Sequence, residues 1–164
     1  MARPLRIWPV LVTFVAAIAI GITPLPESVQ LLRPPLAAMV LIYWVLMWPE
    51  RIGLLTAFAL GIVIDILHGQ LLGQNALALS VVTYITLRFH LQIRIFPLWQ
   101  MTMTVLALLT MIASLQFVVE GIGGFGTMGL GRWPQVIVGT VLWPPVMALL
   151  DRVRQQSETP SSTF

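Results

Sequence analysis

The chain has 164 residues, of which 58% are hydrophobic and 9% are charged, and its mean hydropathy is +0.92. Because a soluble domain carries roughly 25% charged residues, this composition indicates an integral membrane protein without a soluble domain. Cysteine is absent, which excludes disulfides, thiolate metal sites and a cysteine nucleophile. All nine basic residues are arginine, which excludes lysine-dependent phosphate binding and Schiff-base chemistry.

Six hydrophobic spans follow one another, each bounded by proline, glycine or charge: 7–23, 36–48, 52–67, 71–87, 96–119 and 133–150. A straight membrane-spanning helix needs about 20 apolar residues, so the second, third and fourth spans are short. We expect an all-α membrane protein with six transmembrane helices in a compact bundle. This bundle is predicted to form a single domain over residues 1–150. Residues 151–164 are expected to form a short polar tail in the cytoplasm.

The second span is confined between two proline-containing sites, Pro34-Pro35 and Pro49. The apolar run between them is too short to cross a membrane as a straight helix. We therefore expect this helix to begin earlier, near Val29. The proline pair would then lie close to the first turn, where proline is tolerated.

The third and fourth spans lie between Arg51 and Arg88, with no cation between them. One helix over this whole window would be too long for a single crossing, so we expect a reversal at His68-Gly69-Gln70. Small residues recur at four-residue spacing in this region: Ala57 and Gly61, Gly69 and Gly73, and Ala76 and Ser80. In membranes such pairs let helix backbones approach closely, so the two helices are expected to pack tightly.

Asp65 is a carboxylate inside the third span, and a charge at mid-membrane costs about 2.5–3.5 kcal/mol. His68 lies three residues later and would share its helix face, as half of a metal site or proton relay. No third ligand is evident nearby, because Gln74 and Asn75 are poor metal ligands. Asp65 is therefore expected to anchor the turn between the third and fourth helices, and to contribute to a face that docks a protein partner.

The stretch from Gly121 to Gly126 matches the dinucleotide-binding pattern G-x-G-x-x-G, but the strand and helix that this chemistry needs are missing. We expect a flexible outer loop over 121–131. An intramembrane serine protease would need a serine in a Gly-x-Ser-Gly setting, and neither Ser80 nor Ser114 has it. The sequence therefore predicts no enzyme, no cofactor and no metal site.

The last span contains Pro144-Pro145, which follow Trp143. Proline inside a helix removes backbone hydrogen bonds and kinks it. In a membrane, neighbouring helices must then supply partners for the freed groups. We expect this helix to be bent and packed against others, with Trp143 beside the proline pair.

The distribution of arginine predicts the orientation. With six spans, seven arginines fall on the side of both termini: Arg3, Arg6, Arg51, Arg88, Arg94, Arg152 and Arg154. Arg33 and Arg132 fall on the opposite side. Both termini are therefore expected in the cytoplasm, and Glu27, Asp65 and Glu120 near the outer ends of their segments. Because the arginines are dispersed, the sequence predicts no nucleic-acid partner.

The segment from Leu32 to Leu77 resembles the family of the rod shape-determining protein MreD. The matching elements occur in the family's order and spacing: Leu32-Arg33-Pro34, Ile42-Tyr43-Trp44, Pro49-Glu50-Arg51-Ile52-Gly53, Phe58-Ala59-Leu60-Gly61-Ile62-Val63-Ile64-Asp65, Gly69-Gln70-Leu71-Leu72-Gly73 and Ala76. Length, hydropathy, the arginine-rich beginning and the polar tail agree over the whole chain. Pro35 departs from the family pattern, which has a polar or acidic residue there.

The resemblance implies a non-enzymatic subunit of the bacterial elongation machinery in the inner (cytoplasmic) membrane. Proteins of this family associate with the bitopic protein MreC and, through it, with the cytoskeletal protein MreB and the RodA–penicillin-binding synthase. Their fold is similar to that of the substrate-binding subunits of energy-coupling-factor transporters. The candidate partner-interface or structural residues are Arg33, Pro34, Trp44, Pro49, Arg51, Gly53, Gly61, Asp65, His68, Gly69 and Gly73.

A small-solute-binding subunit of a membrane transporter is the alternative function. Such a site needs several polar groups that converge on one cavity. The candidates for lining it are Trp44, Asp65, His68 and Asn75. Because polar residues are few within the spans, the sequence favours a membrane scaffold that contacts protein partners and lipid.

Overall fold

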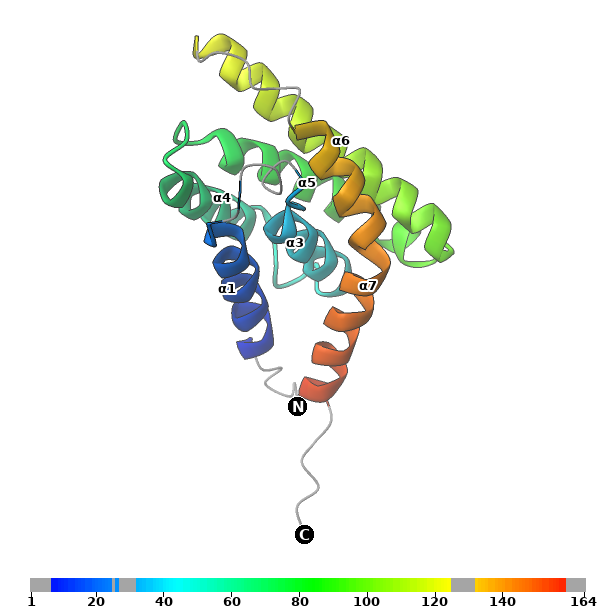
Figure 1. Ribbon diagram of the computed structural model, residues 1–164. Coiled ribbons are helices and arrows are strands. Elements are labelled where there is room, and N and C mark those ends of the chain that lie inside the picture. Colours follow the sequence, from blue (N-terminus) through cyan, green and yellow to red (C-terminus); the bar gives the residue numbers. More distant parts are fainter. Residues whose placement is uncertain (1–6, 25, 27–31, 125–131, 159–164) are drawn as a thin grey trace.

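The computed structural model describes residues 7–24, 26, 32–124 and 132–158, and all the regular structure in this part of the chain is helical (Figure 1). The helices are α1 (Trp8–Ile22), α3 (Leu36–Met47), α4 (Leu54–His68), α5 (Gln74–Arg94), α6 (Leu98–Ile122) and α7 (Trp133–Glu158). The prediction of an all-α fold is confirmed, and each predicted span overlaps one of these helices. By length and composition, α5, α6 and α7 are long and apolar enough to cross a membrane, whereas α1, α3 and α4 are shorter apolar helices.

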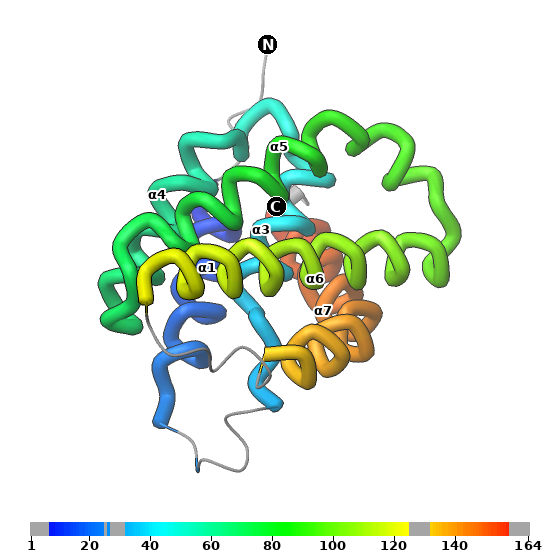
Figure 2. The backbone as a smooth tube through the Cα atoms, turned by 90° about the horizontal axis from the view of Figure 1, so that it is seen from above, coloured from blue at the N-terminus to red at the C-terminus, as the bar shows by residue number. Residues whose placement is uncertain are grey.

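Helix α3 forms the centre of the molecule, where it packs against α1, α5 and α7 (Figure 2). It is apolar on every side, as expected for a helix surrounded by others. Nine of its twelve residues are buried: Ala38, Met39, Val40, Leu41, Ile42, Tyr43, Trp44, Val45 and Leu46. The indole Nε1 of Trp44 donates a hydrogen bond of 2.9 Å to Thr13 Oγ1 of α1. The core therefore lies around α3.

The predicted start of the second helix near Val29 is wrong. Val29 itself lies outside the described residues, but residues 32–35 are not helical and α3 begins at Leu36. A proline disfavours the helical conformation of the residue before it, so Pro34 and Pro35 keep the chain non-helical up to this point. The N–H of Leu36 instead donates to the carbonyl of Pro34 at 2.8 Å.

The predicted reversal between α4 and α5 is confirmed. Helix α4 ends at His68, and Gly69 follows in the left-handed conformation with a φ of 61°. Gly73 has a φ of 98° immediately before α5. L-residues with a side chain rarely adopt such angles, so glycine is required at both positions. The short turn brings α5 back beside α4.

The prediction of tight packing between these two helices is also confirmed. A Cβ atom added to Gly61 would lie 2.2 Å from the Cα of Ala76, a distance that real atoms do not adopt. Ala57 and Ala76 are completely buried at the same contact. The absence of side-chain volume at Gly61 is therefore what lets the backbone of α5 pass directly over α4.

Helix α7 contains Pro144 and Pro145 and changes direction along its length (Figure 1). Trp143, beside the prolines, is completely buried. The helix continues to Glu158, so the first half of the predicted polar tail is helical, while residues 159–164 lie outside the described part. Asp151 stabilises this extension, because its Oδ1 accepts a hydrogen bond of 2.5 Å from the Tyr43 hydroxyl of α3.

Candidate functional site

Asp65 connects the end of α4 to the start of α5. Its Oδ2 accepts a hydrogen bond of 2.8 Å from the backbone N–H of Gly73. Its Oδ1 accepts bonds of 3.0 Å from the backbone N–H of Asn75 and 2.8 Å from the Asn75 side-chain amide. The carboxylate thus caps the N-terminus of α5, where free N–H groups and the helix dipole favour negative charge. These three bonds account for a carboxylate with 0% of its surface exposed.

Asn75 extends this cap to α6. Its side-chain oxygen accepts a hydrogen bond of 2.6 Å from Gln116 Nε2, and its amide nitrogen donates to Gln70 Oε1 at 2.9 Å. Every polar atom of the Asn75 side chain therefore has a partner within the protein. Asp65, Asn75 and Gln116 form one continuous polar connection across α4, α5 and α6.

A second polar connection joins α5, α6 and α7. The side-chain amide of Gln74 donates a hydrogen bond of 2.9 Å to Glu120 Oε1. The same carboxylate forms an ion pair with Arg132, which immediately precedes α7. The Glu120 and Arg132 side chains are only 14% and 21% exposed. Partly buried charges of this kind depend on each other, because removing one leaves the other unpaired.

Arg33 caps the C-terminus of α1. Its guanidinium donates to the carbonyl of Gly21 at 2.5 Å, to that of Ile20 at 2.8 Å, and to that of Thr23. The last carbonyls of a helix have no partner within it, and a cation is favourable there. Among the described residues no carboxylate pairs with Arg33. Arg33 therefore connects the end of α1 to the segment that leads into α3. Its described partners are neutral carbonyls, so they do not balance the guanidinium charge.

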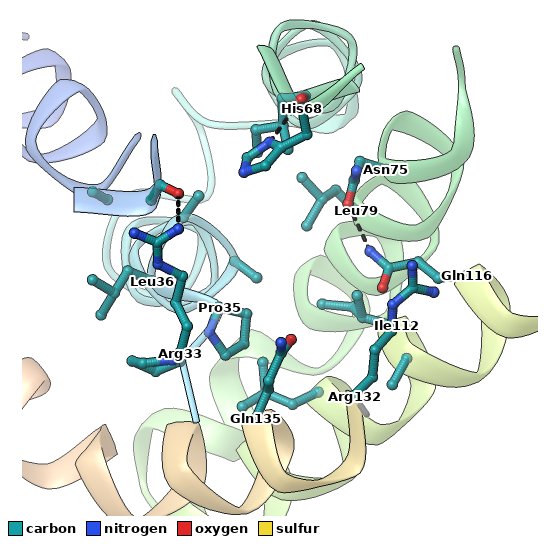
Figure 3. Close-up of a pocket in the computed structure, with 18 of the residues that line it drawn as sticks. Arg33, Pro35, Leu36, His68, Asn75, Leu79, Ile112, Gln116, Arg132 and Gln135 are labelled. Atoms are coloured by element: carbon teal, nitrogen blue, oxygen red, sulfur yellow. Dashed lines mark hydrogen bonds between the residues drawn. The ribbon is translucent and has the colours of Figure 1, made fainter. Parts of the chain in front are cut away.

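A cavity of about 360 Å³ lies among these helix ends (Figure 3). Its polar lining residues are Arg33, His68, Gln70, Asn75, Gln116, Arg132 and Gln135. The remaining lining is apolar and comes mainly from α1, α3, α5 and α6. Among the described residues, no aspartate or glutamate lines it. The alternative function relied on Trp44 and Asp65 as lining residues, and neither lines this cavity, whereas His68 and Asn75 do.

The residues predicted from the family resemblance fall into two regions of the structure. One region surrounds the cavity and the α4–α5 turn: Arg33, Pro34, Gly61, Asp65, His68, Gly69 and Gly73. The other is the connection between α3 and α4: Pro49, Arg51 and Gly53. Trp44 belongs to the buried centre. Gly53 has an extended backbone and open space around its missing Cβ, so neither its conformation nor packing requires glycine there.

Sequence reasoning did not identify the partners of Asp65 or the second polar connection. Gln116 and Glu120 lie four residues apart in an apolar helix, which was a usable signal that one face of α6 meets polar groups. From the sequence, Gln74 is assessed as a poor metal ligand, and Asn75 as a poor metal ligand or as a lining residue of a solute-binding cavity. Among the described residues, no three histidine, aspartate or glutamate side chains gather to hold a metal ion. The groups that are present bind helices to one another through hydrogen bonds.

Comparison with known proteins identifies the family. The model of the rod shape-determining protein MreD family matches residues 1–153. The chain belongs to the MreD family. It is 32% identical over 157 residues to the rod shape-determining protein MreD of Haemophilus influenzae, an alignment that covers 93% of this chain and 94% of that protein. No solved structure matches the chain.

MreD membership gives the chain a role in rod-shape determination. The resemblance first seen between Leu32 and Leu77 is confirmed, and the match extends along almost the whole chain. The apolar helices agree with a membrane protein. MreD proteins are shape-determining proteins rather than a known family of enzymes, and the solute-transporter alternative is not favoured.

Proposed function

We propose that this MreD protein is a non-enzymatic scaffold of the cell-elongation machinery in the bacterial inner membrane. In this proposal it docks an MreC-like bitopic partner and, through it, links MreB to the RodA–penicillin-binding synthase. Family membership over residues 1–153 is the observation that carries the proposal. The polar contacts between helices also support it: Asp65, Asn75 and Glu120 form hydrogen bonds and an ion pair that hold helices together, as a structural role requires.

The proposed topology has six membrane-crossing helices and both termini in the cytoplasm, in a fold like that of energy-coupling-factor substrate-binding subunits. The arginine bias supports this orientation. Arg33 and Arg132 both line the cavity, and this places the two minority arginines at one end of the molecule. The start of α1 and the end of α7 lie at the other end (Figure 1). In this proposal the short helices α1, α3 and α4 also cross the membrane, with their ends packed against the longer helices α5, α6 and α7.

We assign partner docking to the outward face of α4. Its inward face is used by Gly61 and Asp65 for contacts with α5 and the turn. The outward face presents apolar side chains at helical spacing, with Leu55, Phe58 and Ile66 exposed by 84%, 51% and 64%. A single transmembrane helix of a bitopic partner is the kind of element that such a face fits, through van der Waals packing. Gly61 and Asp65 would then act on docking indirectly, through the position of α4.

Co-purification tests the proposal. A tagged chain extracted in mild detergent should retain the MreC-like protein, and the double substitution Leu55→Arg, Ile66→Arg on α4 should abolish this retention. The control is Val141→Arg, a single arginine on the outward face of α7, where Val141 is 70% exposed. Equal retention by all three proteins would contradict docking on α4. Depletion of the gene should separately produce round cells, which tests the role in rod shape without locating the interface.

A further inference from the structure

We propose that the cavity binds the phosphate-bearing headgroup of an anionic membrane lipid. Two arginines lie on opposite sides of the cavity, with Arg33 before α3 and Arg132 before α7 (Figure 3). Guanidinium groups are well suited to phosphate, because their planar set of N–H donors matches its oxygens. The inference goes beyond scaffolding, since it adds a small-molecule site that the docking proposal does not need.

The charges around the cavity favour an anion. Arg33 has only neutral carbonyl partners among the described residues. Two carboxylates lie near the cavity without lining it. Glu120 forms an ion pair with Arg132, and the Asp65 carboxylate accepts hydrogen bonds from N–H groups at the start of α5. The first turns of α3 and α7 also contribute lining residues, and helix N-termini favour negative charge. Among the described residues neither Arg33 nor Asp65 has a counter-ion, and Arg33 is the one of the two that lines the cavity.

Both arginines also have unused hydrogen-bonding capacity. Arg33 Nε and Arg132 Nη1 are buried and have no hydrogen-bond partner within the part of the chain that the structure describes. A buried donor without an acceptor is costly, and an oxygen ligand bound between the two arginines would supply acceptors for these groups. His68 lies on the far side of the cavity, with its Nδ1 2.9 Å from the Ile64 carbonyl of its own helix (Figure 3).

The position and the walls of the cavity favour a lipid over a soluble phosphate. The lining comes from the ends of α1 and α4, the beginnings of α3, α5 and α7, and the interior of α6. In a membrane-embedded bundle, helix ends lie at the level of the lipid headgroups. Leu79, Ile112 and Val136 supply apolar wall beside the arginines. Its volume is near the lower end of the roughly 300–1,000 Å³ of small-ligand sites, so the headgroup enters while the acyl chains remain outside.

Lipid retention tests the proposal. The full-length protein would be reconstituted in nanodiscs of phosphatidylglycerol and phosphatidylcholine, re-extracted in mild detergent and examined by native mass spectrometry. Gln135→Glu places a negative charge in the cavity without a change of shape. Gln92→Glu makes the same change on the exposed surface near the end of α5, away from the cavity. We expect about tenfold lower retention of phosphatidylglycerol by Gln135→Glu than by the wild type or Gln92→Glu.

Unchanged retention by Gln135→Glu would overturn the proposal. If that variant does not fold, His68→Glu provides the same test from an exposed cavity position. Glycerol 1-phosphate, a headgroup without chains, distinguishes the two phosphate sources. Weak or absent binding of it by the lipid-free protein supports a lipid site, whereas saturable binding as tight as that of phosphatidylglycerol would overturn the assignment to lipid.

Discussion

The centre of the molecule and the end that surrounds the cavity are held together by different forces. At the centre, α3 is buried on all sides, and its contacts are almost entirely apolar. At the cavity end, Asp65, Asn75 and Glu120 join helices through a few hydrogen bonds and an ion pair. Apolar packing is non-directional, and its energy is spread over many contacts. The polar end instead depends on individual atoms, so small chemical changes there should have effects that side-chain volume does not predict.

The largest effect is expected at the α4–α5 crossing, where the missing side chain of Gly61 is itself the determinant. Gly61→Leu would force the two helix backbones apart, because even a Cβ atom meets the Ala76 backbone. We expect a loss of more than about 3 kcal/mol of stability, above the usual range for overpacking because backbone has to move. Thermal unfolding in detergent, followed by circular dichroism, measures it. Gly53→Ala is the control, and a similar loss in both variants would contradict the close crossing.

Substitutions of Asp65 test whether the stability of the cavity end depends on single atoms. Asp65→Ala removes the acceptor for two backbone N–H groups and one amide, and we expect it to cost about 3 kcal/mol. Asp65→Asn keeps one oxygen and should cost roughly half as much. Unfolding midpoints of the two variants measure the difference. If Asp65→Ala unfolds at the wild-type temperature, the carboxylate does not hold the turn.

Trp44 provides the matching test in the apolar centre. Trp44→Phe loses the hydrogen bond to Thr13 and some ring volume, and we expect a cost of about 2 kcal/mol. Thr13→Val removes the acceptor, together with the local bond from the Thr13 hydroxyl to the Val10 carbonyl, and should cost less, about 1 kcal/mol. The two changes share one bond, so the double variant should cost less than the sum of the two. Full additivity in unfolding experiments would show that this bond does not stabilise the protein.

The smallest effect is expected at the contact between α3 and the end of α7. Tyr43→Phe removes the hydroxyl that donates to Asp151, and a single hydrogen bond of this kind contributes about 1 kcal/mol. The change should loosen residues beyond Leu150 without altering the cavity end. Limited proteolysis of α7 measures it, with cleavage after Arg152 or Arg154 expected to accelerate. If the wild type is cleaved as fast as Tyr43→Phe, the Tyr43 hydroxyl does not hold this extension of α7.

The sequence predicted those features that depend on neighbouring residues. Continuous apolar runs located the helices, and Gly69 and Gly73 located the reversal, because both signals are local. The small residues at Ala57 and Gly61 predicted a close helix contact. The resemblance to the MreD family rested on the order of these same elements, and it was confirmed along the chain.

Features that depend on distant partners could not be predicted in the same way. Asn75 meets Gln116, and Gln74 meets Glu120, only after α5 and α6 are packed. The cavity exists because helix ends from the whole chain converge, which no local pattern records. The continuation of α7 into the polar tail has the same cause, since Asp151 finds its partner on α3. Helix α3 begins later than predicted, because consecutive prolines disfavour the helical conformation of the residues that precede them.

In the proposed function, Asp65 holds α4 in the position from which its outward face docks an MreC-like partner. Photo-crosslinking in cells from Phe58 tests this proposal, because its side chain is half exposed on that face. We predict a crosslink from Phe58 to the MreC-like protein, its marked weakening by Asp65→Ala at equal protein level, and no such crosslink from Val141 on α7. A crosslink from Val141 but none from Phe58 would contradict it.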